Sequence, residues 1–238
     1  WDSLLEQAAR PDFSVLDREL TETIRALGLE GKSAAQVGCN NARELLSLAS
    51  LKVIPSVGID QSGAFLEQGR VLAKAAGLEP RLIEADIYDL PDDVGTFDLV
   101  LVTIGVLNWM PDLGGFFRVI AGLLGPGGHL LVYETHPVME MFDPESDTPH
   151  EPAISYFRTD PLKEEGLISY DGVDHGSGET GYWFIHTLGQ IVTSCATAGM
   201  TITSLKEFGY SIREPEYDVY EGREAQIPMS YLLHARKM

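Results

Sequence analysis

A run of small residues and an acid downstream of it could together hold a nucleotide. The run Val37-Gly38-Cys39-Asn40-Asn41-Ala42, called the glycine turn below, follows a short apolar segment and precedes a stretch whose leucines recur at helical spacing. Such a strand–turn–helix unit can direct backbone N–H groups toward phosphate or sugar groups. Asp60 ends the next apolar segment, 22 residues after Gly38, where an acid commonly binds ribose hydroxyls. The alternative for Asp60 is that it only caps the following helix, beside Ser62.

Two histidines could act as general bases. His136 follows a predicted strand and Glu134, and the carboxyl ends of parallel strands form the edge at which ligands bind. His186 precedes a predicted helix and could be brought opposite by the intervening segment. A neutral imidazole accepts a proton near pH 7, so His136 is the first candidate and His186 the second. Each could equally be a capping or surface residue, and Glu134 could orient either histidine or bind a cationic acceptor.

Other reactive groups favour structural interpretations. Cys39 lies before a predicted helix, where thiol pKa values fall, but Asn41 replaces the last glycine of a nucleophile elbow. A packed turn residue whose backbone faces the cofactor is the favoured interpretation of Cys39. The six histidines show neither H-E-x-x-H nor clustered Cys/His spacing, so we expect no metal site.

Alternating apolar segments and amphipathic stretches predict the elements that position these residues. Short apolar, often β-branched segments predict buried parallel strands at 33–37, 56–59, 81–84, 98–104 and 128–134. Helical periodicity predicts helices near 42–50, 63–76 and 112–124. This alternation implies a parallel sheet with right-handed crossovers.

The ends of the chain follow different patterns. Ser14 and Asp17 predict the start of a helix that includes Leu16 and ends at Gly28, within a helical cap over residues 1–30. After His136 the chain is rich in Pro, Gly and acids, so we expect an inserted lid over 137–186. A helix near 187–199 and strands near 201–209 and 229–236 complete a single domain, 1–238.

Composition limits the partners. The 238 residues carry a net charge of −19, with 44% hydrophobic residues. An acidic surface repels nucleic-acid phosphates, so we expect a small-molecule partner and no nucleic acid. No apolar segment approaches the roughly 18–20 residues that a membrane span requires, and no membrane association is expected. Two cysteines favour a reducing, cytoplasmic location, and the protein is expected to be a monomer or homodimer.

Five short motifs occur in a characteristic order along the chain. They are the glycine turn, Val57-Gly58-Ile59-Asp60-Gln61-Ser62, Glu84-Ala85-Asp86-Ile87-Tyr88-Asp89-Leu90-Pro91, Phe97-Asp98-Leu99-Val100-Leu101-Val102 and Leu123-Leu124-Gly125-Pro126-Gly127-Gly128-His129-Leu130. Together they resemble the motifs of the class I S-adenosylmethionine-dependent methyltransferases, and the match covers nearly the whole chain. The resemblance implies a Rossmann-like α/β fold with a seven-stranded, mostly parallel sheet. Its order would be 3-2-1-4-5-7-6, with the last strand antiparallel and helices on both faces.

The resemblance also implies the cofactor, S-adenosyl-L-methionine, and the residues that bind it. Asp60 would bind both ribose hydroxyls, Asp86 the adenine amino group and Ile87 the adenine ring. The full set of expected cofactor-binding residues is Gly38, Cys39, Asn40, Asp60, Gln61, Asp86, Ile87 and Thr103. One departure is that Asn40 stands where the family usually has glycine. Asn tolerates positive φ better than other non-glycine residues, so we expect the turn to be kept.

The expected reaction is an in-line displacement. A nitrogen, oxygen or sulfur atom of a small acceptor would take the methyl group, leaving S-adenosyl-L-homocysteine, with catalysis mainly by positioning. Polar and aromatic residues after the fourth strand, at the end of the fifth strand and in the lid would form the acceptor site: Asn108, Trp109, Glu134, Tyr156, Phe157 and Trp183. Aromatic walls would exclude water and attract the sulfonium.

Two alternatives remain open. One is an NAD(P)-dependent oxidoreductase, since Asp60 would serve either cofactor; the missing G-x-G-x-x-G, Asp86 and the terminal strand pair argue against it. The other is a non-catalytic S-adenosylmethionine-binding protein, for which the altered glycine turn is the only indication.

Overall fold

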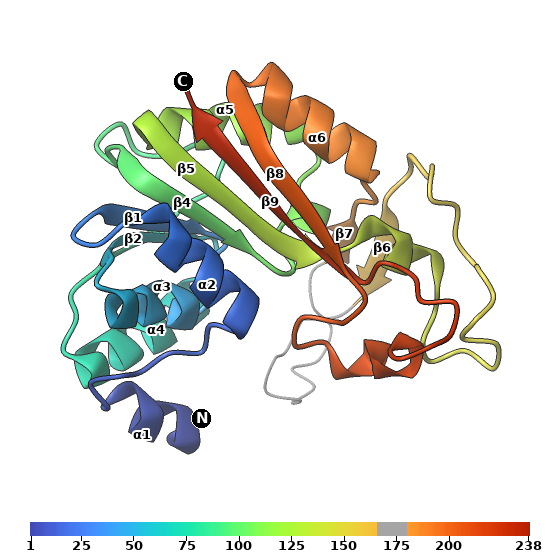
Figure 1. Cartoon of the computed structure of the whole chain (residues 1–238), viewed down its shortest axis with the longest axis horizontal. Helices are drawn as coiled ribbons and strands as arrows, with labels where there is room; N and C mark the ends of the chain where they lie inside the picture. The colour runs from blue at the N-terminus through green and yellow to red at the C-terminus, as the bar shows by residue number, and fades with distance from the viewer. Residues whose placement is uncertain (166–179) are drawn as a thin grey trace.

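The computed structural model describes residues 1–165 and 180–238, without the side chains of residues 164 and 165. In these ranges seven strands form one sheet in the order β3-β2-β1-β4-β5-β9-β8 (Figure 1). The strands are β1 (Ser33–Val37), β2 (Ile54–Asp60), β3 (Arg81–Glu84), β4 (Phe97–Thr103), β5 (Leu124–Thr135), β8 (Met200–Phe208) and β9 (Ser230–Lys237). β9 runs antiparallel to both of its neighbours, whereas the pairings from β3 to β5 are parallel. This confirms the predicted fold and strand order.

Helices cover both faces of the sheet (Figure 1). On one face α5 (Leu113–Leu123) and α6 (Leu188–Thr197) pack against a buried apolar cluster that includes Val100, Val132 and Phe116. The opposite face is covered by α2 (Arg18–Leu27), α3 (Arg43–Ser47) with the 3₁₀ turn η1 (Leu48–Leu51), and α4 (Gly63–Ala76). Central strands such as β4 are buried on both faces, which explains their continuous apolar sequence.

The start of α2 corrects one expectation. The helix begins at Arg18, and Asp17 is its N-cap, accepting a hydrogen bond from the Leu20 amide at 2.9 Å. Ser14 lies outside the helix, where its hydroxyl accepts from the Leu16 amide at 3.3 Å. One cap is enough to start the helix because the Asp17 carboxylate already satisfies an unpaired N-terminal amide. Gly28 ends α2 in the left-handed conformation, as predicted. The preceding helix α1 (Asp2–Ala8) packs against α4.

Two segments of the chain cover the carboxyl edge of the parallel strands. One follows β5 and contains the 3₁₀ turn η3 (Pro137–Met141) and the hairpin β6 (Leu162–Glu165) and β7 (Thr180–Trp183). The other joins β8 to β9 and contains η4 (Pro215–Tyr220). Met139, Tyr220 and Met229 form a buried cluster between them. The predicted lid therefore has a second part, residues 209–229; Tyr170 and Gly176-Ser177-Gly178 of the first part lie outside the described residues.

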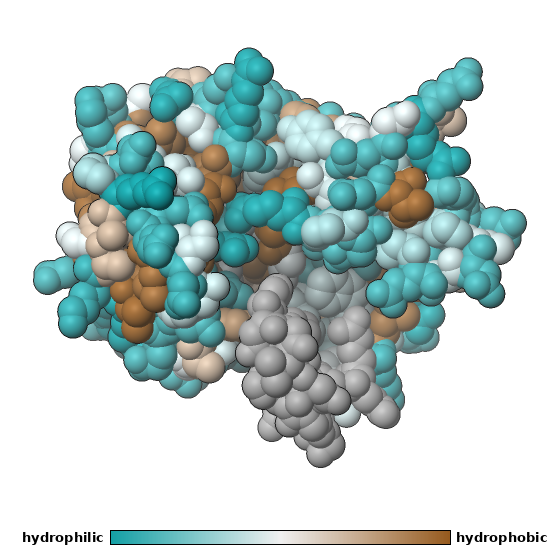
Figure 2. All heavy atoms as spheres, turned by 90° about the horizontal axis from the view of Figure 1, so that it is seen from below, coloured by the Kyte–Doolittle hydropathy of each residue, from teal (hydrophilic) through white to brown (hydrophobic). Residues whose placement is uncertain are grey.

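The surface seen from below is largely hydrophilic (Figure 2). On the face seen in Figure 2, hydrophilic residues predominate and hydrophobic ones gather only in small patches. Within the described ranges, no helix is both long enough and apolar enough to cross a membrane.

Candidate functional site

The glycine turn adopts left-handed backbone conformations at three of its residues. Gly38 has φ 62°, Asn40 φ 50° and Ala42 φ 59°. Asn40 thus takes the positive φ that we expected of it in place of glycine. Within the turn the Cys39 amide donates to the Ile59 carbonyl at 3.0 Å, and the Cys39 carbonyl accepts from the Ala42 amide at 2.7 Å. The backbone of Cys39 therefore holds the turn against β2, and its contact with a cofactor stays a prediction.

Close packing on both sides of the turn requires two small residues. A Cβ on Gly38 would lie 2.4 Å from the Val106 Cγ2, and one on Gly58 would lie 2.9 Å from the Cys39 Sγ. The Cys39 thiol is fully buried, and burial raises its pKa well above the usual value. A thiol that is buried and protonated in this way supports the structural interpretation of Cys39 and not a nucleophile.

Asp60 lies at the carboxyl end of β2, directly beside the glycine turn. Its Oδ2 accepts from the Asn40 amide at 2.7 Å, and its Oδ1 accepts from the Ser62 amide at 2.9 Å. A carboxylate can accept about four hydrogen bonds, so two positions remain for the hydroxyls of a ribose. Ser62 itself caps α4, accepting from the Phe65 amide at 3.4 Å. The residues present therefore fit a nucleoside, and Gln61 is exposed beside Asp60.

The remaining predicted cofactor residues occupy different environments. Asp86 is exposed after β3, and its Oδ1 accepts from the Tyr88 amide at 2.9 Å. Ile87 is buried in the apolar cluster beneath α5. Thr103 is buried at the end of β4, and its hydroxyl oxygen accepts from the Gln36 side-chain amide at 3.1 Å. Of these three, Asp86 has the side chain that is open to a ligand.

Gln36 is a structural anchor that sequence reasoning missed. Its side chain is fully buried on β1, donates to Thr103 and accepts from the Leu45 amide at 2.9 Å. It therefore joins β1, β4 and the first turns of α3. A polar residue within an otherwise apolar strand was the available signal.

A buried ion pair behind the glycine turn was also missed. Glu44 on α3 is 5% exposed and contacts Arg43 at 2.9 Å and the guanidinium of Arg213. Arg213 comes from the connection between β8 and β9. Burial alone would raise the pKa of Glu44, but the charges of Arg213 and Arg43 outweigh burial, and the pKa is lowered. The pair ties the 209–229 segment to the cofactor side of the sheet.

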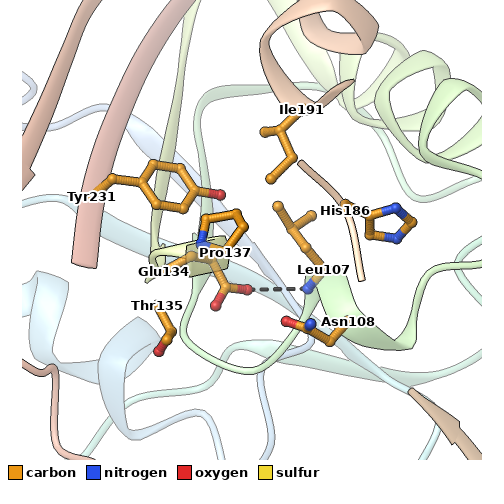
Figure 3. Close-up of a pocket in the computed structure, with 8 residues that line it drawn as sticks. All are labelled: Leu107, Asn108, Glu134, Thr135, Pro137, His186, Ile191 and Tyr231. Atoms are coloured by element: carbon orange, nitrogen blue, oxygen red, sulfur yellow. Dashed lines mark hydrogen bonds between the residues drawn. The ribbon is translucent and has the colours of Figure 1, made fainter. Parts of the chain in front are cut away.

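A recess of about 240 Å³, including the solvent space at its mouth, lies where β4 and β5 end (Figure 3). It is lined by Leu107, Asn108, Glu134, Thr135, Pro137, His186, Ile191 and Tyr231. Three residues of the predicted site, Asn108, Glu134 and His186, thus meet in one place. Tyr231 on β9 was not predicted; it lies opposite Glu134 in the β5–β9 pairing.

Glu134 organises the turn after β4. Its carboxylate accepts from the backbone amides of Gly105 at 2.8 Å, Val106 at 2.8 Å and Leu107 at 3.1 Å. Burial raises the pKa of Glu134 to about 8, while these three N–H groups oppose the shift. Neither histidine is among its partners, so the expectation that Glu134 orients one of them is wrong.

His136 is not placed to act as the general base that we expected. Its Nδ1 accepts from the Val138 amide at 3.1 Å, which makes it the N-cap of η3. Its Nε2 lies 3.0 Å from the Glu207 Oε1, and the ring does not line the recess. Burial lowers the pKa of His136, although Glu207 opposes this shift. The capping interpretation of His136 is the one that the structure supports.

His186 lines the recess and keeps one nitrogen able to accept a proton. Its Nε2 lies 2.8 Å from the Met110 carbonyl, which can only accept, so Nε2 carries the hydrogen. Nδ1 is then the basic nitrogen. Burial lowers the pKa of His186 although hydrogen bonds to the Met110 and Leu107 backbone oppose this shift, and the lowered pKa keeps the imidazole neutral near pH 7. Within the described residues, no group of three His, Cys, Asp or Glu side chains could hold a metal ion.

Asn108 and two tryptophans connect the lid hairpin to the 3₁₀ turn η2 (Leu107–Trp109). The Asn108 side chain donates to the Phe184 carbonyl at 3.0 Å, and the Phe184 amide donates to the Asn108 carbonyl at 2.7 Å. Trp109 meets Trp183 edge to face, with ring centroids 5.2 Å apart. The Trp183 indole donates to Glu140 at 2.8 Å. These contacts place the lid hairpin over the recess, and acceptor binding by the two tryptophans stays a prediction.

Two further aromatic residues of the predicted acceptor site differ in position. The Tyr156 hydroxyl accepts from the Leu188 amide at 2.9 Å, at the start of α6. Phe157 is 77% exposed and packs edge to face on Tyr156. Neither Tyr156 nor Phe157 lines the recess, and their contact with an acceptor stays a prediction.

The sheet order, the glycine turn and the acid at the end of β2 define a Rossmann-like protein that holds a nucleoside cofactor. Residues 35–132 match a family model described as a methyltransferase domain. This segment is less than half of the chain; together with the sheet order it makes the protein similar to the class I S-adenosylmethionine-dependent methyltransferases, whose methyl donor is S-adenosylmethionine. This similarity favours the methyltransferase over the nicotinamide-dependent alternative.

Curated relatives and solved structures extend this result. A demethylmenaquinone methyltransferase of Thermus thermophilus is 40% identical over 84 residues, or 34% of this chain and 36% of that protein. One of Mycolicibacterium gilvum is 30% identical over 127 residues, covering 49% of this chain and 54% of that protein. The chain thus matches only a third to a half of these relatives' length. A putative S-adenosylmethionine-dependent methyltransferase of Listeria monocytogenes superposes with TM-score 0.65 at 17% identity, covering 92% of this chain and 97% of that one. At 17% identity, the similarity to the Listeria protein shows a shared fold and nothing about the substrate.

Proposed function

We propose that this protein transfers the methyl group of S-adenosylmethionine to a nitrogen, oxygen or sulfur atom of a small molecule held in the recess beside Glu134. One observation carries the proposal: the backbone of residues 105–107 binds Glu134, while the Val106 side chain packs against Gly38. The glycine turn and the recess therefore share a wall. A donor at the turn and an acceptor in the recess would be neighbours, as an in-line displacement requires.

The proposed cofactor contacts follow from the donor and acceptor groups at the carboxyl edge. Asp60 would accept from the ribose hydroxyls and Asp86 from the adenine amino group, with Ile87 against the ring. Gly38, Cys39 and Asn40 would contact the cofactor through the turn, and Gln61 and Thr103 would lie at its sides. When bound, the cofactor supplies an electrophilic methyl group on a sulfonium.

The chain's own contribution is to position the acceptor, exclude water and accept a proton. Trp109 of η2 and Trp183 of the lid hairpin would close the recess against water. His186 would hold the proton at Nδ1 when the acceptor must be deprotonated, because burial keeps its imidazole neutral. The net charge of −19 supports a small-molecule acceptor over a nucleic acid. A cytoplasmic location and a monomeric or homodimeric state remain predictions.

Calorimetric titration with S-adenosylmethionine tests the cofactor half of the proposal. We expect micromolar binding by the wild type and at least tenfold weaker binding by Asp60→Ala, since two hydrogen bonds to ribose are lost. Asp92→Ala removes an exposed acid after β3 and should bind as the wild type does. Folded wild-type protein that does not bind S-adenosylmethionine would refute the proposal; binding without turnover of any acceptor would support the non-catalytic alternative.

A second candidate acceptor comes from the curated relatives, which are named demethylmenaquinone methyltransferases. The matched segments cover about a third to a half of those proteins, so the acceptor is not settled by the match. Incubation with S-adenosylmethionine and a demethylmenaquinone, with mass spectrometry of the products, would identify this activity directly.

A further inference from the structure

The phenol of Tyr231 is buried in the recess without a partner. The side chain is 0% exposed, and its hydroxyl oxygen has no hydrogen-bond partner among the described residues. A buried unpaired hydroxyl is unfavourable by about 1–3 kcal/mol, so such a group requires an explanation. In Figure 3 the hydroxyl points from β9 toward the middle of the recess. A bound ligand is the partner that this position makes available.

The carboxylate of Glu134 has one further position for a hydrogen bond in the same recess. Two backbone amides, of Val106 and Leu107, use its Oε1, whereas only the Gly105 amide uses its Oε2. A carboxylate oxygen accepts two bonds, so Oε2 can take one more. The described lining of the recess therefore presents an acceptor oxygen from Glu134 and another from Tyr231.

The lining also carries no positive charge. None of the described residues around the recess is Lys or Arg, and Thr135 donates its hydroxyl to Glu214 at 2.6 Å. An anionic group placed here would have no cation to neutralise it and would lie near the carboxyl groups of Glu134 and Glu214. A neutral or cationic group with several N–H donors, in contrast, needs no positive charge in the lining and can donate to the acceptor oxygens there. A hydroxyl or thiol offers one donor, and an amino group offers two or three.

We propose that the acceptor is an amine, and that Tyr231 and Glu134 bind the nitrogen through two of its N–H groups. This inference rests on the proposed methyl transfer and names its acceptor class. With two N–H groups directed to the Tyr231 oxygen and Glu134 Oε2, the remaining position on nitrogen is free for the lone pair. The oxygens thus orient the nucleophile as well as select it.

Methyl transfer to an amine can be written with His186, the amine and the cofactor alone. The bound ammonium gives one proton to His186 Nδ1, which exposes the nitrogen lone pair. That pair forms a bond to the methyl carbon as the carbon–sulfur bond breaks, and the sulfur keeps its electron pair. The product is a methylammonium with two N–H groups left, and His186 releases its proton to water. A secondary amine offers one N–H group fewer when neutral, so a single methylation should predominate.

Three probes that differ only in the reacting group test the proposal: 2-phenylethylamine, 2-phenylethanol and 2-phenylethanethiol. Each is incubated with the whole protein and S-adenosylmethionine, and methylated product is measured by mass spectrometry. We expect kcat/KM at least tenfold higher for the amine, and N-methyl-2-phenylethylamine as the main product. Tyr231→Phe should raise KM for the amine about tenfold, with kcat changed less than twofold.

Tyr133→Phe is a matched control from the neighbouring strand. Its hydroxyl donates to the Asp17 carboxylate at 2.5 Å, so its loss should lower the melting temperature and leave the amine KM unchanged. Tyr231→Phe should melt at or above the wild-type temperature, because no bond within the protein is lost. A purely structural role for the Tyr231 hydroxyl would give the reverse pattern.

The outcomes separate this inference from the proposed function. Lack of S-adenosylmethionine binding by calorimetry would refute the proposed function itself. If the cofactor binds, three results would overturn the amine proposal alone: methylation of the alcohol or thiol in preference, methylation of none of the three probes, or an unchanged amine KM in Tyr231→Phe.

Discussion

Val106 packs so closely on Gly38 that a Cβ at position 38 would lie 2.4 Å from the Val106 Cγ2. The backbone amide of the same valine donates to Glu134 at 2.8 Å. A single residue after β4 thus contacts the glycine turn with its side chain and the acceptor recess with its backbone. A substitution in the glycine turn is therefore expected to alter the acceptor recess, and a substitution in the recess to alter the turn.

Gly38→Ala should weaken S-adenosylmethionine binding at least tenfold and lower the melting temperature. The added methyl group displaces Val106, and φ 62° is unfavourable for alanine by about 1 kcal/mol or more. Gly122→Ala is the control: this exposed glycine in α5 has open space and an ordinary φ, so alanine should leave binding unchanged and raise stability slightly. Calorimetry and thermal unfolding measure both effects, and equal behaviour of the two variants would contradict the packing argument.

Glu44→Gln should destabilise the fold by about 2–3 kcal/mol at pH 7, because Arg213 and Arg43 lose a buried partner. The pKa of Glu44 is lowered in the folded state, so its contribution to stability is present above the usual value of 4.5 and is lost as pH falls. Urea unfolding between pH 7 and pH 3 should show that the free energies of unfolding of the wild type and Glu44→Gln approach each other as the pH falls. Glu22→Gln, which removes an exposed i,i+4 pair with Arg18, should differ little from the wild type at any pH.

For Glu134→Gln, the difference in the free energy of unfolding from the wild type should depend on pH in the opposite direction to that of Glu44→Gln. Burial raises the pKa of Glu134 to about 8, so its contribution is fully present below 4.5 and is lost as pH rises toward 8. The free energy of unfolding of the wild type, minus that of the variant, should therefore decrease between pH 5 and pH 8. A constant difference across this range would mean that the three backbone amides keep Glu134 ionised throughout.

His186→Gln should reduce kcat at pH 7 by at least about 100-fold when the acceptor must lose a proton. Burial lowers the pKa of His186, so wild-type activity should fall on the acid side below the usual 6.5, where Nδ1 becomes protonated. That acid limb should disappear in the variant. His136→Gln should keep both the rate and the limb, because His136 lies outside the recess. Full turnover by the double variant would eliminate a histidine base.

Local signals predicted most of the elements that position the site. The apolar segments around β1 and β4 and the Asp112 cap of α5 are encoded within a few residues, so the strands and helix are found close to where they were expected. Asn40 was recognisable because few residues other than glycine accept its backbone conformation. The boundary of α2 was displaced because two polar residues three positions apart, Ser14 and Asp17, carry the same capping signal.

Side-chain partners distant in sequence could not be predicted. Glu134 binds amides nearly 30 positions earlier, and Glu44 pairs with Arg213 across 169 positions. Nothing local distinguishes a carboxylate that will meet three amides from one that will meet a histidine. His136 was misassigned for the same reason: its partners, Val138 and Glu207, were not visible together in the sequence.

The size of the recess bears on how widely acceptors can vary. Of its roughly 240 Å³, only about 10 Å³ is enclosed space, room for about one water molecule, whereas pockets that enclose a drug-sized molecule measure about 300–1,000 Å³. At most a water-sized reacting group of an acceptor would fit among the residues that line it, and the rest of the acceptor would lie outside the enclosed space. Substrate choice would then be strict at the methylated atom and permissive beyond it, so that a series of compounds sharing one head group would be processed at similar rates.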